Sequence, residues 1–154
     1  MKLRIMSDLH LDHPRSDGPP PLAAGADMAI VAGDTRHSLV KGIEHLRRAY
    51  PAPTEVVMDA GNHELWSREL SFEKHFAEGR RAGDLHDVHL LENNVGIVDN
   101  LRLPGCTLWM DYELFGSSLR GAAMRVAAET MVDHRRIQVK PAFKPAFAVD
   151  LPDG

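Results

Sequence analysis

Three short segments of apolar side chains near the N-terminus are each followed directly by polar residues. Residues 2–6 alternate polar and apolar side chains, residues 26–32 form a compact apolar run, and residues 55–59 contain three adjacent apolar side chains. Alternation and short apolar runs bounded by polar turns are typical of β-strands. The pattern therefore predicts three strands, each of which delivers the chain into a polar loop.

The segment between the second and third of these strands carries the signals of a helix. Ser38 can cap its first turn, apolar side chains recur on one face at Leu39, Ile43 and Leu46, and Pro51 stops it. Strand, helix, strand order predicts a parallel sheet, and ligands bind beyond the carboxyl ends of the strands in such sheets. The three polar loops are therefore expected to share one edge.

The rest of the chain predicts a mixed α/β order. The tail, residues 139–154, contains prolines and no sustained period, so we expect it to be irregular and to follow a single domain over residues 1–138. The other expected elements are helices at 71–81 and 117–136, a short strand at 88–91, and a hairpin of 95–98 with 101–109 that turns at Asp99-Asn100.

Composition and charge narrow the classes of function. The 154 residues are 44% hydrophobic and 26% charged, which is ordinary for a globular protein. The net charge of -4 disfavours nucleic acid as a partner, although basic pairs such as Arg47-Arg48 are present. Cys106 has no second cysteine to pair with, and neither a signal peptide nor a membrane-spanning run is found. We expect a cytoplasmic protein without a membrane partner.

Five side chains in the three loops have the chemistry of a metal site. Asp8 and His10 can share a face on either side of one residue, Asp34 offers two carboxylate oxygens, and Asn62 with His63 offers an amide oxygen and an imidazole. Taken singly, each has a structural interpretation as well, because aspartate and asparagine favour turns and caps and histidine is common on surfaces.

The order of the three motifs is more specific than any one of them. Asp8-Leu9-His10, Gly33-Asp34 and Gly61-Asn62-His63-Glu64 each follow a predicted strand. In this the chain resembles the calcineurin-like metallophosphoesterases, whose opening motifs are D-x-H, G-D and G-N-H-[DE]. The resemblance runs from about residue 3 to about residue 137. It implies an α/β fold: a truncated sandwich with a mainly parallel first sheet, flanking helices and the opening hairpin of a second sheet, which makes the domain over residues 1–138 incomplete.

The resemblance also implies a role for each motif residue. Asp8 and His10 would bind a first metal ion, Asp34 would bridge two ions, and Asn62 would bind the second. His63 would act as the general acid toward the leaving oxygen, so that His63 and Asp34 are the implied catalytic residues. The implied reaction is hydrolysis of a phosphomonoester or phosphodiester by a metal-activated water, with Mn, Fe or Zn as the ion.

The chain departs from the family after the third motif. The family's later strand-end histidine and its G-H-x-H motif are absent, and we interpret His75, His86, His89 and His134 as surface histidines. The second ion is therefore expected to bind weakly. The alternative function is a catalytically impaired homologue that serves as a metal-binding, phosphate-binding or interaction module. An uncovered hairpin and apolar tail also predict a homo-oligomer.

Four residues in or near the motifs are interpreted as surface or structural residues. His13 and His37 are expected to be exposed loop residues, although either could contact a metal or phosphate. Glu64 is expected to support His63 or its loop. Trp66 is interpreted as a packing residue rather than a platform for substrate.

Overall fold

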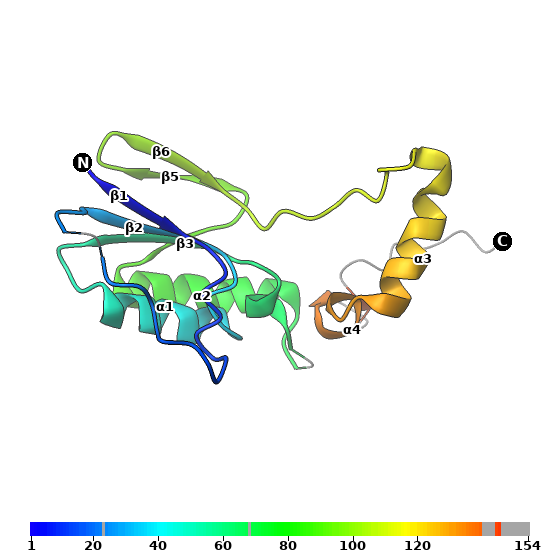
Figure 1. Cartoon of the computed structure of the whole chain (residues 1–154), viewed down its shortest axis with the longest axis horizontal. Coiled ribbons are helices and arrows are strands. Elements are labelled where there is room, and N and C mark those ends of the chain that lie inside the picture. The colour runs from blue at the N-terminus through cyan, green and yellow to red at the C-terminus, as the bar shows by residue number, and fades with distance from the viewer. Residues whose placement is uncertain (23, 68, 140–143, 146–154) are drawn as a thin grey trace.

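The computed structural model describes residues 1–22, 24–67, 69–139 and 144–145. Its centre is a four-stranded parallel sheet in the order β1-β2-β3-β4 (Figure 1). The three N-terminal strands and the strand expected at 88–91 are confirmed, with small shifts at their ends. Their bounds are Leu3–Met6 for β1, Met28–Ala32 for β2, Glu55–Asp59 for β3 and His89–Leu91 for β4.

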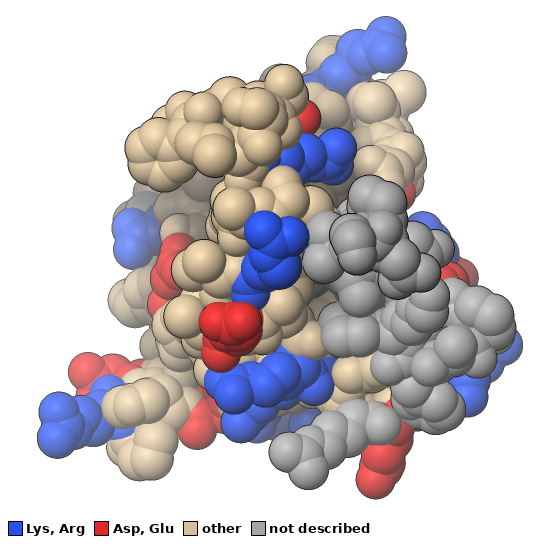
Figure 2. Space-filling view, turned by 90° about the vertical axis from the view of Figure 1, so that its right-hand side faces the viewer, with Lys and Arg blue, Asp and Glu red and all other residues tan. Residues whose placement is uncertain are grey.

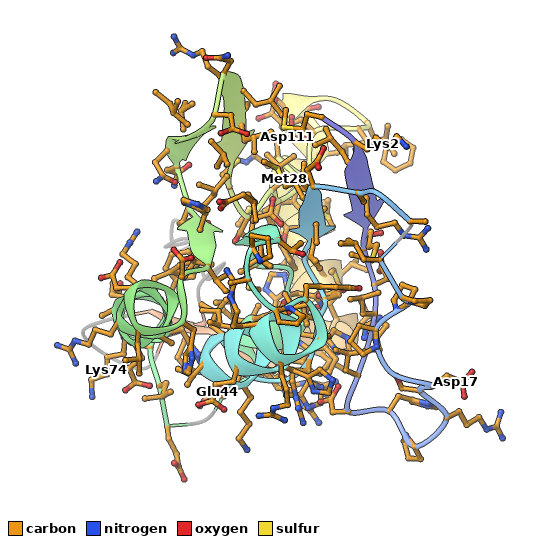
Figure 3. All side chains as sticks on the ribbon, turned by 90° about the vertical axis from the view of Figure 1, so that its left-hand side faces the viewer. Lys2, Asp17, Met28, Glu44, Lys74 and Asp111 are labelled. Carbon is orange, nitrogen blue, oxygen red and sulfur yellow. The ribbon has the colours of Figure 1, made fainter. Side chains whose placement is uncertain are left out.

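Two helices, α1 (Leu39–Ala49) and α2 (Phe72–His86), cover one face of this sheet (Figure 1). The three apolar residues that predicted α1 are no more than 1% exposed, and the Ser38 hydroxyl accepts a hydrogen bond from the backbone N–H of Lys41 at 3.4 Å. Figure 3 shows Glu44 of α1 and Lys74 of α2 pointing away from the sheet. The amphipathic pattern is thus satisfied by burial against the strands.

The helix α2 is longer than the sequence predicted. It continues from residue 81 to His86 and ends where Asp87 adopts a left-handed conformation. No proline interrupts this stretch, and Ala82 and Gly83 are buried, so tertiary packing extends the helix beyond its periodic apolar face.

A β-hairpin forms the layer on the other face of the sheet (Figure 1). Strands β5 (Asn94–Val98) and β6 (Leu101–Gly105) pair antiparallel, and the turn falls at the expected Asp99-Asn100. The second strand ends at Gly105 rather than at residue 109. Apolar residues of the sheet and of the hairpin meet in a small cluster: Met28, Val57, Leu91 and Val98.

The α/β class is therefore confirmed, whereas the expected sandwich is seen only in outline. Within the described ranges, the second layer is the two-stranded hairpin. Val56 and Met58 contribute to the main core, and Val57, between them, contributes to the cluster with the hairpin. Successive side chains of β3 thus point to opposite faces of the sheet, one into the main core and the other toward the hairpin.

The single helix expected at residues 117–136 is broken. The chain forms a 3-10 turn at Ser117–Leu119, then α3 (Arg120–Thr130) and the short α4 (Asp133–Arg136). Met131 is extended with ψ 132, and the Thr130 hydroxyl donates to the carbonyl of Val126, which competes with continued helix.

The chain beyond α4 contains two short paired strands, β7 (Gln138–Val139) and β8 (Lys144–Pro145). The irregular tail expected at 139–154 otherwise lies outside the described residues, and the domain boundary at residue 138 stays a prediction. No helix in the described part of the chain is long and apolar enough to cross a membrane.

A half-buried carboxyl at the end of β3 is expected to make the stability of the fold depend on pH. Burial, followed by the nearby Glu92, raises the pKa of Asp59 to about 6. The unfolded chain releases this proton nearer pH 4, so ionisation of Asp59 costs folding free energy as the pH rises from 4 to about 6. We expect Asp59→Asn to increase the free energy of unfolding by about 1 kcal/mol at pH 8, after allowance for solvent screening, and to have little effect at pH 3.

Urea denaturation in EDTA at the two pH values measures this effect. The exposed Asp17→Asn variant is the control for removal of a charge. A gain that is equal at both pH values would show that Asp59 is not the titrating group.

Candidate metal centre

The loops that follow β1, β2 and β3 lie side by side at the carboxyl edge of the sheet. The backbone N–H of Asp8 donates to the carbonyl of Gly33 at 3.2 Å, and that of His10 donates to the carbonyl of Asp34 at 2.9 Å. These bonds continue the pairing of β1 and β2 into their loops. The first two motifs are therefore held together by backbone, as the parallel order of strands predicted.

The second and third loops touch through glycines. A Cβ atom on Gly33 would lie 2.6 Å from the backbone nitrogen of Gly61, and a Cβ on Gly61 would lie 2.7 Å from the backbone nitrogen of Asp34. Neither separation is sterically allowed. The glycines of the G-D and G-N-H motifs are thus required so that Asp34 can approach the third loop.

Three candidate residues occupy the left-handed region of the backbone map. The φ angles are 54° for Asp8, 41° for His10 and 52° for Asp34. Residues other than glycine adopt such angles rarely, and positions of this kind cluster at functional sites. The backbone bonds between the loops hold these conformations in place.

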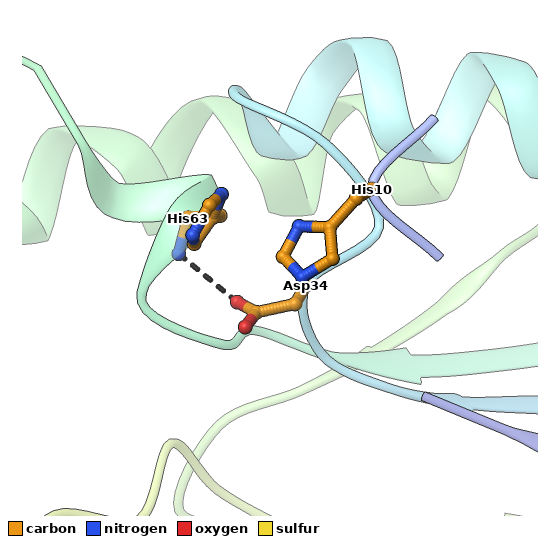
Figure 4. Close-up of side chains that lie close together, drawn as sticks. All are labelled: His10, Asp34 and His63. Carbon is orange, nitrogen blue, oxygen red and sulfur yellow. Dashed lines mark hydrogen bonds between the residues drawn. The ribbon is translucent and has the colours of Figure 1, made fainter. Parts of the chain in front are cut away.

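His10, Asp34 and His63 form a group that can hold a metal ion (Figure 4). One ligand atom from each residue lies within 4.8 Å of the others. The Asp34 carboxylate also accepts a hydrogen bond from the backbone N–H of His63 at 3.0 Å, which ties the third loop to the second. One carboxylate and two imidazoles make a mixed oxygen and nitrogen donor set that suits zinc, manganese or iron.

The protonation state of His63 suits a metal ligand. Its Nδ1 atom is buried and has no hydrogen-bond partner among the described residues. Burial is the main cause that lowers the pKa of His63; Asp34 opposes this effect, and His10 and His37 add to it. The imidazole is therefore neutral near pH 7, which is the form that binds a cation.

Asp8 and Asn62, the other two residues expected to bind metal, have different surroundings, and their roles as ligands stay predictions. The Asp8 carboxylate is 4.0 Å from Nε2 of His10, and its side chain is 67% exposed. The side-chain amide of Asn62 donates instead to Oδ1 of Asp133 at 2.5 Å. His63, to which the resemblance gave an acid's role, lies among the potential ligands.

The side chain of Glu64 links the loop after β2 to the loop after β3. It is fully buried, and its carboxylate accepts backbone hydrogen bonds from Asp34 at 3.0 Å, Thr35 at 2.5 Å, Arg36 at 3.3 Å and Gly61 at 2.9 Å. Burial is the main cause that raises the pKa of Glu64, and the backbone donors of Thr35 and Arg36 oppose that effect. Glu64 therefore supports its own loop through Gly61, as the sequence suggested, and it supports the Asp34 loop as well.

A pocket of about 340 Å³ opens beside His10 and His63 of the group. The His37 ring lies at its wall, with Nδ1 3.1 Å from the Asp12 carboxylate, which also accepts the backbone N–H of His37 at 3.0 Å. Trp66 stacks on His63, with ring centroids 3.8 Å apart. The residues lining the pocket are His10, Asp12, His13, Pro14, His37, His63 and Trp66.

Three of these pocket residues were missed or undervalued from sequence. His37 and Asp12 are 25 positions apart, and only the pairing of the first two loops brings them together. Trp66 packs against the core as interpreted, and it also forms part of the pocket wall. The available signal was proximity in sequence to Asp34 and His63, which alone does not separate a pocket residue from a surface residue.

Two of the four later histidines are not on the surface. His75 is 4% exposed and His134 is 3% exposed, and burial lowers the pKa of both. Nε2 of His134 lies 2.9 Å from the hydroxyl of Tyr112. Their interpretation as surface histidines was wrong because α2 and α4 pack these positions inward.

Among the residues that the structure describes, the charged side chains do not form a broad basic surface on the face drawn in Figure 2. Figure 2 shows lysine and arginine side chains there mixed with acidic and uncharged ones, as far as the described residues extend. This agrees with the net charge of -4.

Comparisons with known proteins give one likeness in three dimensions. No family model matches the chain, and no curated protein matches it. The structure resembles the crystal structure of phosphopantetheinyl hydrolase from Mycobacterium tuberculosis, with 21% sequence identity and a TM-score of 0.67. The likeness covers 91% of this chain and 56% of that one, so the chain spans a little over half of its length. At this identity the likeness shows the fold alone.

These comparisons overturn the assignment to the calcineurin-like metallophosphoesterases. No family model supports it, and the solved structure that resembles the chain is described as a phosphopantetheinyl hydrolase. The physical reason for the error is that three short strand-end motifs describe a site at the edge of a parallel sheet, and such sites occur on many folds.

Proposed function

We propose that the chain hydrolyses a phosphoester with the help of a divalent metal ion bound by His10, Asp34 and His63. The observation that carries the proposal is the convergence of these three side chains within 4.8 Å at the carboxyl edge of the sheet. The Asp34 carboxylate suits a cation, and so does the neutral His63 imidazole, whose buried Nδ1 has no hydrogen-bond partner among the described residues. Mn, Fe and Zn are the proposed ions because oxygen and nitrogen ligands are mixed.

The residues around the group have separate roles in this proposal. An ion bound there would polarise the phosphoryl group and lower the pKa of a bound water. Asp34 places negative charge at the centre of the three loops, and His10 and His63 flank it. Asp8 and Asn62 supply further oxygens at the border of the group. His37, held by Asp12, presents its ring to the same pocket where a phosphoester would lie.

The similar structure suggests which phosphoester to test first. It is a phosphopantetheinyl hydrolase, so a phosphopantetheinyl ester joins generic aryl phosphomonoesters and phosphodiesters as a trial substrate. The chain, freed of metal with EDTA, is expected to turn over at least one of these after addition of Mn²⁺, Fe²⁺ or Zn²⁺. Ion binding without turnover would favour the alternative of a metal-binding or phosphate-binding module. Absence of both would refute the proposal.

One variant separates two roles for His63. If His63 is an ion ligand, His63→Ala should weaken ion binding by at least about tenfold. If His63 is a general acid, His63→Ala should lose turnover while its ion affinity stays the same. The lowered pKa favours the ligand, because a general acid must be protonated. Titration calorimetry with Mn²⁺ on His63→Ala, compared with His13→Ala from the pocket rim, measures this.

Self-association is a further part of the proposal. The inner face of the hairpin packs on the sheet of the same chain, but Val95 and Ile97 on the hairpin remain 46% and 68% exposed. Exposed apolar side chains also occur at Leu114 and Phe115. Patches of this kind favour association of copies. Light scattering at micromolar concentration is expected to give a homodimer or larger mass, and a monomer mass would contradict it.

A further inference from the structure

Asp133 is a buried carboxylate that bonds to the loop after β3 from a distant part of the chain. It begins α4 and is 7% exposed. Its Oδ1 atom accepts two hydrogen bonds, from the side-chain amide of Asn62 at 2.5 Å and from the indole N–H of Trp66 at 2.7 Å. The pairing with Asn62 spans 71 positions.

The chemistry of these contacts fixes which way the Asn62 amide faces. An ionised carboxylate only accepts hydrogen bonds, so the NH₂ end of the amide must face Asp133. The reverse orientation would set two acceptor oxygens against each other. Because the oxygen and nitrogen of an amide diverge from the same carbon atom, the carbonyl oxygen of Asn62 takes no part in this bond and can face another group.

The surrounding contacts keep Asp133 at this position. The backbone N–H of Ser67 donates to the carbonyl of Arg136 at 3.0 Å, and the Arg136 guanidinium lies 4.7 Å from the centroid of the Trp66 ring. The third loop and α4 are thus joined by four contacts. A carboxylate held this firmly can restrict the rotation of the side chain that it binds.

We propose that Asp133 is a positioning residue that presents the carbonyl oxygen of Asn62 to a divalent ion. The inference rests on the proposed function, since it assigns to Asn62 an oxygen for the ion held near His10, Asp34 and His63. Side chains that orient a metal ligand through a hydrogen bond typically change metal affinity 10-fold to 100-fold when they are removed. The site would then depend on α4 as well as on the three loops.

A double-mutant cycle distinguishes this role from a merely structural one. Mn²⁺ affinity is measured by calorimetry on the whole chain, on Asn62→Ala, on Asp133→Ala and on the double variant, with Glu129→Gln on exposed α3 as the control for a lost carboxylate. Asp133→Ala is expected to weaken binding about tenfold or more in the parent chain and to have no further effect in Asn62→Ala. An equal loss in both backgrounds, or no loss in either, would overturn the inference.

A second measurement uses the unaltered chain and so does not depend on whether Asp133→Ala folds. Addition of Zn²⁺ should shift the side-chain amide resonance of Asn62 together with the ring resonances of His10, as seen by nuclear magnetic resonance. Histidine shifts with an unmoved Asn62 amide would overturn the positioning role and leave the proposed function standing. If neither set of resonances moves, the chain does not bind the ion and the proposed function itself fails.

Discussion

Replacement of Asp34 by alanine is expected to reduce metal-dependent phosphoester turnover by at least about a thousandfold, because a metal ion contributes several kcal/mol to stabilising such transition states. Asp34 is the only carboxylate in the three-residue group found within the described part of the chain. Without it, two imidazoles would be the only ligands left in this group for a divalent cation. Ion affinity should therefore fall with the turnover.

Asp34→Asn is the matched variant for this prediction. The asparagine oxygen can still accept the backbone N–H of His63, which Asp34 accepts at 3.0 Å, so the loops should keep their arrangement. Melting temperatures of the metal-free proteins check this, and Mn²⁺ titration with turnover measures the site. Asp17→Asn, on an exposed loop, controls for the change in net charge. Full turnover in Asp34→Asn would show that the reacting site is elsewhere.

The parts of the site that the sequence predicted are those carried by local pattern. Apolar runs ending in polar residues located β1, β2 and β3, and the parallel order implied that Asp34 and His10 would meet. The glycines next to Asp34 and Asn62 were recognised as parts of the motifs, and the structure gives the distances that require them there. Local patterns of this kind act within a few residues, so one sequence is enough to detect them.

The parts that could not be predicted depend on contacts between distant residues. Asp133 reaches Asn62 across 71 positions, and Asp12 reaches His37 across 25. The burial of His134 depends on how α4 returns to the body of the molecule after the helix breaks at residue 131. None of these pairings leaves a periodic signal, because each is set by tertiary packing rather than by the local backbone.

The family assignment failed for a related reason. The motifs describe how three loops of a parallel sheet meet, and they say little about the layers outside that sheet. Residues after the hairpin, which form α3 and α4, carried no motif and yet supply Asp133 to the centre. A fold is specified by such outer elements as much as by the edge where the ligand binds.

Glu64 is expected to contribute the largest share of stability among the residues around the centre. Glu64→Ala would leave four backbone N–H groups, which now donate to a fully buried carboxylate, without their acceptor. Each buried donor left unsatisfied costs about 1 to 3 kcal/mol, although a water in the space can recover part of this. We expect a loss of about 3 to 5 kcal/mol in the free energy of unfolding.

Glu64→Gln tests whether the acceptor atoms are the cause. One of its two terminal atoms becomes an NH₂ group that faces backbone donors, so this variant should lose about 2 kcal/mol despite its nearly identical shape. Urea denaturation in EDTA measures both variants against Glu129→Gln, whose carboxylate is exposed. If Glu64→Gln were as stable as the unaltered chain, the four bonds would not be what holds the Asp34 and Gly61 loops together. If it is destabilised as expected, metal-free chains should also lose the alignment of Asp34 with His63, because Glu64 joins the two loops from which these side chains come.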